Sequence, residues 1–242
     1  MKIDNLLLQT GKDIPFSQAG VTIHVPTLAE ISMIGEKNFL IGCHFLNFNK
    51  DILSDEDKIG LENKDNFDIF MSIMNSSERA IHKINTLMVL ALLFPQYKIK
   101  IDKDKILLQL ENFSSSINKQ NFEEFKSIIN QIFCLQGASS EDEYNPADAL
   151  AARIAEKIKK GKIKRNKQED DKDLSIYAKY ISILAVGLKK DKNELSNYTI
   201  YQIRDEFQRF IMERKYDIYV RAKLAGAQDL EEVEDWMNDI HP

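Results

Sequence analysis

The sequence predicts a mainly α-helical protein with a small β component. An N-terminal α+β unit should be followed by a helical C-terminal region that ends in a long helix and a short amphipathic helix. Glycine and proline number only 9 and 5 in 242 residues, which favours long regular elements. Convincing strand patterns occur only in the first half of the chain, whereas helical apolar spacing continues to its end.

The N-terminal unit should open with strands. Residues 21–25 (VTIHV) alternate apolar and polar side chains, as a half-buried strand does, and residues 1–10 are the expected partner strand. Thr27 and Glu30 then have the three-residue spacing of a capping box. Apolar residues continue at helical spacing after them, so we expect one helix over about residues 28–46.

Three further helices and a hairpin should complete this unit. FDIFMSIM predicts a short helix, and Ser77 can cap a second one, ERAIHKINTLMVLALLF, which Pro95 ends. YKIKI and KILLQL flank DKDK and predict a β-hairpin. NFEEFKSIINQIFCL carries its phenylalanines and isoleucines on one side, which predicts an amphipathic helix.

A change in composition places the domain boundary after the last of these helices. GASSEDEYNP is acidic, rich in small residues and typical of a linker. We therefore expect an N-terminal α+β domain at residues 1–136, an acidic linker at 137–145 and a helical C-terminal region at 146–242. A charge-rich stretch at 161–173 should form a second linker within that region.

Helices should dominate the C-terminal region. A first helix is expected from Pro146, and a second at LSIYAKYISILAVGL. The longest, IYQIRDEFQRFIMERKYDIYVRAKLA, should form a rod of roughly 40 Å that ends at Gly226. Asp229 should cap a short terminal helix, with Glu232 three residues later. The long helix carries one apolar stripe, which consists of Ile200, Ile203, Phe207, Ile211, Ile218, Ala222 and Ala225.

No catalytic, cofactor-binding or metal site is expected. The four histidines lack metal-ligand spacing, and neither a GxSxG motif nor a phosphate-binding glycine loop occurs. Cys43 and Cys134 lie in apolar surroundings and should be buried free thiols. The N-terminus lacks the pattern of a signal peptide, and the longest apolar run, Thr86–Phe94, is about half of a membrane span. These features predict a soluble, intracellular protein without enzymatic activity or a cofactor.

Nucleic-acid binding is not expected either, because the net charge is −5. The basic run Lys157–Lys167 carries seven positive charges in eleven residues, but it has no aromatic residue to stack on bases. EDDKD follows almost at once and compensates its charge. A solvated linker is the preferred interpretation.

The C-terminus carries the best candidate for a binding site. Its apolar positions are spaced three and four apart, which is the spacing of anchors on a helix that lies in a groove. Two interpretations of the only tryptophan, Trp236, stay open: it packs back on the long helix, or it anchors another chain. The candidate partner-binding residues are Leu230, Val233, Trp236, Met237 and Ile240, supported by Phe207, Arg209 and Phe210.

Three segments of the chain resemble known proteins. IHVPTLAEISMIGEKNFL resembles the opening of proteins encoded in the tail modules of phages that infect Gram-positive bacteria. SIYAKYISILAVGLKKD with YTIYQIRDEFQRF, and then YDIYVRAKLAGAQDLEEVEDWMNDI, resemble the ends of the same proteins, the tail assembly chaperones. None of these segments is a catalytic signature.

The resemblance implies a non-enzymatic protein of the host cytoplasm. Such a chaperone would coat the tape measure protein before the tail tube polymerises, bring tube subunits to it and then leave. Its partners would be the tape measure and tail tube proteins, with self-association left open and no membrane involved. Two alternatives stay open, namely a structural component of the virion tail (a connector or baseplate subunit) and a nucleic-acid-associated regulator that uses Lys157–Lys167.

Overall fold

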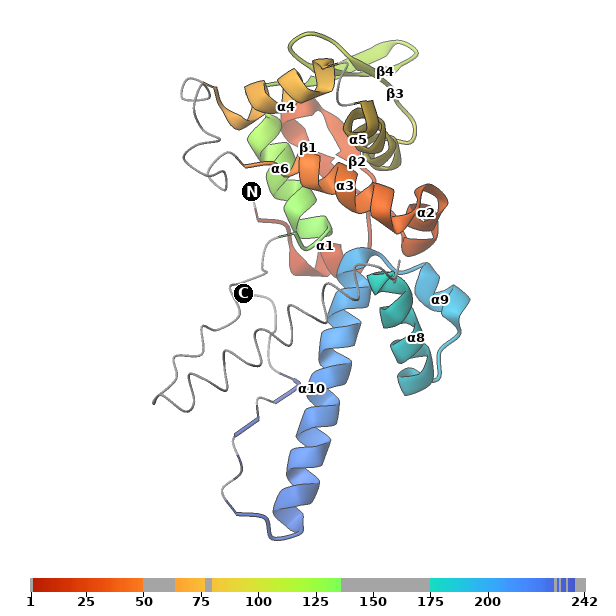
Figure 1. The fold of residues 1–242 in the computed structure, drawn as a ribbon, viewed down its shortest axis with the longest axis vertical. Coiled ribbons are helices and arrows are strands. Elements are labelled where there is room, and N and C mark those ends of the chain that lie inside the picture. Colours follow the sequence, from red (N-terminus) through yellow and green to blue (C-terminus); the bar gives the residue numbers. More distant parts are fainter. Residues whose placement is uncertain are drawn as a thin grey trace.

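A computed structural model confirms the predicted fold class, with short helices and two small antiparallel sheets in an N-terminal body and a helical C-terminal region (Figure 1). The long last helix projects away from this body. The structure describes residues 2–49, 64–76, 80–135 and 175–228, together with 230, 232–233 and 235–237. The predicted linkers at 137–145 and 161–173, the helix from Pro146 and the basic run at 157–167 lie outside these residues.

The chain opens with a helix, so the prediction of a strand over residues 1–10 is wrong. The Asp4 carboxylate caps helix α1 (Asn5–Gln9) by accepting from two of its first backbone amides. Strand β2 (Val21–Ile23) pairs instead with β1 (Ile14–Phe16), which is antiparallel to it. Alternate residues of both strands point into the core.

The single helix predicted over residues 28–46 is two helices, α2 (Leu28–Ile34) and α3 (Glu36–Leu46). Gly35 separates them because its backbone has φ 83° and ψ 136°, which is far from helical. The predicted capping box at the start of α2 is confirmed, with Thr27 and Glu30 bonded to each other's backbone amides.

Aromatic side chains fill the centre of the N-terminal body. The predicted helices α4 (Asn66–Asn75), α5 (Ala80–Leu93) and α6 (Phe122–Ile132) are all present. One face of α6 and the residue after it contact phenylalanines from four other parts of the chain. The pairs lie 4.9–6.0 Å apart between ring centroids: Phe16–Phe125, Phe39–Phe133, Phe67–Phe122, Phe70–Phe122 and Phe94–Phe125.

The predicted hairpin is confirmed, and a third strand extends it. β3 (Lys98–Ile101) pairs with β4 (Ile106–Leu110), and β4 pairs with β5 (Phe113–Ile117). β5 escapes prediction because three serines interrupt its apolar pattern. The turn before it uses Glu111 at φ 34° rather than glycine, so the usual turn signal is missing.

The C-terminal region contains α8 (Ile176–Leu188), α9 (Lys192–Ser196) and α10 (Ile200–Leu224). Helices α8 and α10 were expected from their apolar spacing, whereas α9 is a single short turn that no such pattern marks. A capping box of Thr199 and Gln202 begins α10. Gly226, at φ 86°, follows its end as predicted.

The first turns of α10 belong to the same core as the N-terminal body. Leu184 of α8, Leu195 of α9 and Ile203 of α10 are fully buried in one hydrophobic cluster with the N-terminal helices. The amide of Leu28 donates to the Tyr198 carbonyl at 2.9 Å, so the start of α2 is bonded to the start of α10.

The predicted terminal helix is wrong for the residues that the structure describes. Leu230, Glu232–Val233 and Asp235–Met237 lie outside any helix. The sequence of this segment places carboxylates three and four residues apart, and like charges at that spacing destabilise a helix. A helix of about twelve residues is also marginal in water without tertiary contacts. Within the described part of the chain, no helix is both long and apolar enough to cross a bilayer.

Candidate functional site

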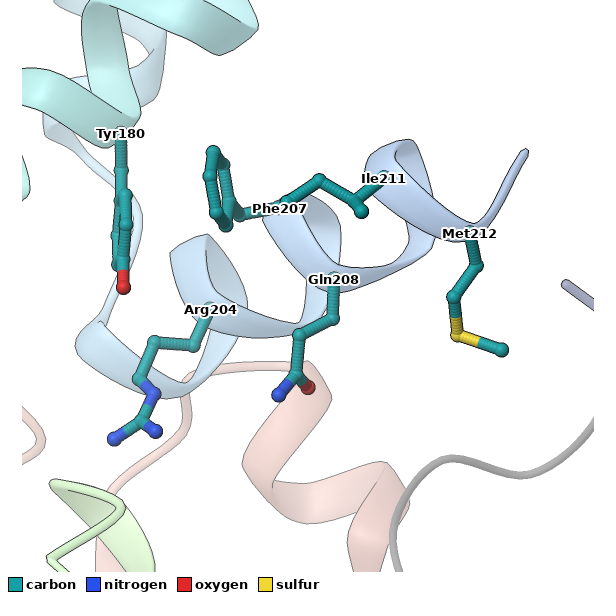
Figure 2. Close-up of a pocket in the computed structure, with 6 residues that line it drawn as sticks. All are labelled: Tyr180, Arg204, Phe207, Gln208, Ile211 and Met212. Carbon is teal, nitrogen blue, oxygen red and sulfur yellow. The ribbon is translucent and has the colours of Figure 1, made fainter. Parts of the chain in front are cut away.

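A pocket of about 350 Å³ lies between α8 and α10, at the level where α10 leaves the body. Figure 2 shows Tyr180 of α8 facing Phe207 of α10. Arg204, Gln208, Ile211 and Met212 of α10 complete the lining. The pocket therefore combines two aromatic rings, two aliphatic side chains and two hydrogen-bonding groups.

Close packing of the two helices positions this lining. The Tyr180 and Phe207 rings are stacked, with centroids 4.2 Å apart and planes 22° apart. Gly187 allows the Phe210 ring to approach α8, since a Cβ atom at that position would lie 2.3 Å from the end of the ring. The side chain of Leu184 is fully buried and fixes the same helix to the core.

Hydrogen bonds to the N-terminal body fix the inner half of α10, residues 200–207. Arg204 donates from Nη1 to the Cys134 carbonyl at 2.7 Å, just after α6. Gln202 donates from Nε2 to the Gln9 carbonyl at 2.7 Å, at the end of α1. The Ser175 hydroxyl, which caps α8, donates to the Glu36 carboxylate of α3. The pocket therefore lies on a rigid part of the molecule.

The outer half of α10, residues 208–224, is far less covered. None of its residues is fully buried, and Figure 1 shows that it extends beyond α8 and α9. Ile218 is 67% exposed and Leu224 is 83% exposed. Basic residues outnumber acidic ones by five (Arg209, Arg214, Lys215, Arg221 and Lys223) to two (Glu213 and Asp217). The outer half thus presents apolar side chains on a basic surface.

The predicted partner-binding residues fall into three places. Phe207 lines the pocket, and Phe210 packs against α8, with the Arg214 guanidinium 5.2 Å from its ring centroid. Arg209 is paired with Asp205 at 3.5 Å and also donates to the Trp236 carbonyl at 3.0 Å. Leu230 and Val233 are half-buried, and Ile240 lies outside the described residues.

Trp236 and Met237 are exposed rather than core residues. Their side chains are 37% and 68% exposed. One of the two interpretations was that Trp236 packs back on the long helix. Its backbone does lie next to α10, but its side chain is not buried there. Whether these residues hold a partner stays a prediction.

Sequence reasoning did not single out three of the pocket residues, Tyr180, Gln208 and Met212, whereas Arg204 belongs to the arginines of the long helix that were expected to support binding. Ile211 belongs to the predicted apolar stripe of α10. Tyr180 lies four residues before the buried Leu184 on the same face of α8, so helical spacing could have indicated it. Polar lining residues carry no such signal, because they resemble ordinary exposed helix positions.

The two cysteines are free, as predicted, but only Cys43 is buried, whereas Cys134 is half-buried. Burial strongly raises the pKa of the Cys43 thiol. Burial also raises the pKa of Cys134, although the charge of Arg204 opposes this. A thiol with a raised pKa is protonated at neutral pH and unreactive. No group of three or more potential metal ligands occurs among the described residues.

One comparison with known proteins covers this site. Residues 166–241 match the family model of the YomV second domain. This is a phage-derived family, from a Bacillus prophage, so the match is consistent with a phage origin for the chain. The region similar to the YomV second domain includes α8, α9, α10 and the C-terminal segment, and thus the whole pocket. Neither the curated proteins nor the solved structures gave a match.

Proposed function

We propose that this chain is a non-enzymatic phage tail assembly chaperone. It binds the tape measure protein, the tail tube protein or both during tail morphogenesis, and then leaves. The observation behind this proposal is that the outer half of α10 projects from the folded body and carries exposed apolar side chains, while the start of the helix is bonded to that body. The phage-derived family that matches the same region supports the phage context.

The surface is suited to one helix or extended segment of a partner. Exposed apolar residues on α10 and the adjacent aromatic pocket can receive anchors spaced along such a segment. The inner half of α10 is already fixed by Arg204 and Gln202. Binding therefore requires little reordering of the chaperone itself, and this lowers its entropic cost.

The charge of the outer half favours transient binding over permanent incorporation. Interfaces of permanent complexes are more apolar than the surface in general and depleted of charge at their core. Here Arg214 and Lys215 lie between Ile211 and Ile218 in the sequence, so charged side chains interrupt the apolar ones. Such a surface fits a partner that is held and later released.

A matched pair of variants tests the location of the surface. Ile218→Asp places a charge on the outer half of α10, and Ile81→Asp does the same on α5 of the body. The two isoleucines are 67% and 70% exposed, so each change should alter the free energy of unfolding by no more than about 0.5 kcal/mol. Only Ile218→Asp should weaken partner binding.

The experiment is a pull-down of the tagged full chain from phage-producing cells, with purified particles analysed alongside by mass spectrometry. Tape measure or tube protein should be recovered with the wild type and with Ile81→Asp, and the recovery should fall at least about fivefold with Ile218→Asp. The chain should be absent from the particles. Its presence there at fixed stoichiometry would make it a structural component of the tail instead.

A further inference from the structure

The chain reverses direction at the end of α10. The Gly226 amide donates to the Lys223 carbonyl and the Ala227 amide donates to the Ala222 carbonyl, both at 3.0 Å. With Gly226 in a left-handed conformation, these two bonds form a Schellman motif. The segment that follows is therefore directed back toward the helix that it has just left.

This segment returns along the outer half of α10. Arg209 donates to the Trp236 carbonyl at 3.0 Å, although the two residues are 27 apart in sequence. Seventeen helical residues separate Arg209 from Gly226, a distance of about 26 Å. Ten extended residues can span about 33 Å, but ten helical ones span only about 15 Å. The described residues of this segment lie outside any helix, which agrees with a return that reaches as far as Arg209.

The returning segment and the helix have opposite charges. Residues 229–239 contain six carboxylates and no basic residue, whereas the outer half of α10 is net basic. The pKa of Lys223 is raised mainly by its hydrogen bond with Tyr219. The negative charge of Glu232 raises it to a smaller extent. Among the described residues of this segment, Glu232 therefore lies close enough to Lys223 for their charges to interact.

The contact between them is thin. Trp236 and Met237 stay partly exposed, and so do Ile218 and Leu224 on the helix. Exposed ion pairs contribute little free energy and weaken with salt. The described residues are bonded to the helix through the Arg209–Trp236 hydrogen bond, and the remaining attraction is between exposed charges, so the segment can be displaced at small cost.

We propose that the described residues Leu230, Glu232–Val233 and Asp235–Met237, here called the C-terminal strap, are an intramolecular ligand of the outer half of α10. The partner that displaces the strap shares its chemistry, namely an extended acidic segment with apolar anchors. The inference rests on the proposed function only in assigning this surface to a partner. Within the chain, the strap competes with that partner and weakens its binding.

Trp236 is the only tryptophan, so its fluorescence reports on the strap in the intact chain. Acrylamide, a neutral quencher, should quench it two- to threefold less than a free peptide of residues 227–242, roughly in proportion to its exposed fraction of 37%. Molar salt, Lys223→Glu or Arg209→Gln should each raise quenching toward the peptide value. Lys98→Gln, which removes an exposed charge on β3, should leave it unchanged. Wild-type quenching equal to that of the free peptide would overturn the proposal.

A second measurement tests the chemistry of the partner. A labelled peptide of residues 227–242 serves as the probe, and its binding is followed by fluorescence anisotropy. Neutralising the strap with Glu232→Gln and Asp235→Asn should tighten binding of the probe at least about threefold, because an intramolecular competitor has been weakened. A probe with all carboxylates changed to amides should bind at least about tenfold more weakly than the acidic one. Two results would refute the proposal. One is an equal affinity of the acidic probe for the wild-type and the neutralised chain, and the other is an equal affinity of the acidic and the amide probe for the wild-type chain.

Neither measurement involves the tape measure or the tail tube protein. A failure of the strap would therefore show in the purified chain, whereas a failure of the proposed function would show only in the pull-down and in the particles.

Discussion

Gly42 of α3 lies directly against α5, and replacing it by alanine should destabilise the protein. A Cβ atom there would lie 2.5 Å from the Asn85 carbonyl oxygen and 2.6 Å from Val89 Cγ2. Ordinary contacts begin near 3.4 Å, so the two helices would have to separate by almost 1 Å. The obstructing oxygen belongs to the backbone of α5 and cannot rotate away.

Two opposing effects set the magnitude. Overpacking a core costs about 1–3 kcal/mol. Alanine gains up to about 1 kcal/mol over glycine in a helix. Because the new methyl group meets a backbone oxygen that cannot move aside, the upper part of the overpacking range, about 2–3 kcal/mol, applies. After the gain from alanine, the net loss should be about 1–2 kcal/mol, which lowers Tm by roughly 2–8 °C in a chain of this size. Urea unfolding followed by circular dichroism measures the free energy, and a thermal melt measures Tm.

Gly187→Ala is the matched control, because Gly187 is also within a helix and gains the same propensity. Its new methyl group would meet the half-buried ring of Phe210, which can turn toward solvent. Gly42→Ala should therefore cost at least about 1 kcal/mol more than Gly187→Ala. Equal costs, or a Gly42→Ala variant as stable as the wild type, would refute the assigned packing of α3 on α5.

Three further predictions concern the core, the acid stability and the cysteines. Leu184→Ala should lower the free energy of unfolding by about 2–5 kcal/mol in a urea titration, because the side chain is fully buried; a loss below 1 kcal/mol would show that α8 is not fixed to the core. Burial opposes ionisation of Glu30, but hydrogen bonds from the Thr27 backbone and hydroxyl outweigh it and lower the pKa below the ordinary value of 4.5. A carboxylate with a lowered pKa stabilises the folded state above that ordinary value, and the stabilisation disappears as the pH falls. Glu30→Gln should therefore lose less free energy of unfolding than the wild type between about pH 5 and pH 3. Parallel plots of this free energy against pH for the two proteins would contradict the prediction. Ellman's reagent should label Cys134 faster than the buried Cys43 in the native chain, and the reverse order would disprove their assigned environments.

Most of the fold could be predicted from the spacing of apolar residues and from capping residues. The stripe of α10, the Thr27 capping box and the phenylalanine face of α6 are local patterns, and each element formed where its pattern lies. The break at Gly35 was missed because apolar spacing continues across it, while one residue takes a non-helical conformation.

The errors at the two ends of the chain have tertiary causes. Residues 1–10 alternate weakly, but Asp4 caps the helix Asn5–Gln9, and β2 pairs with β1 rather than with these residues. The C-terminal segment has helical spacing, yet its described residues lie outside any helix, the chain reverses at Gly226, and Arg209 donates to the Trp236 carbonyl. Spacing alone does not reveal a contact with a helix that precedes it in the sequence.

The candidate site was predicted in part for the same reason. Phe207, Arg209 and Phe210 were selected on α10 by residue type, and they lie at or beside the pocket. The contribution of α8 depends on how Gly187 and Leu184 bring Tyr180 against Phe207. Packing between two separate helices is not encoded in either helix alone.

Site-specific photo-crosslinking in phage-producing cells tests the central claim most directly. A benzophenone side chain would replace Ile218 on the outer half of α10 in the full chain or, as the control, the similarly exposed Ile81 on α5. We expect a crosslink to the tape measure or tail tube protein from position 218 and none from position 81. Crosslinks to these proteins from position 81 alone, or from neither position, would contradict the assignment of α10 as the partner surface.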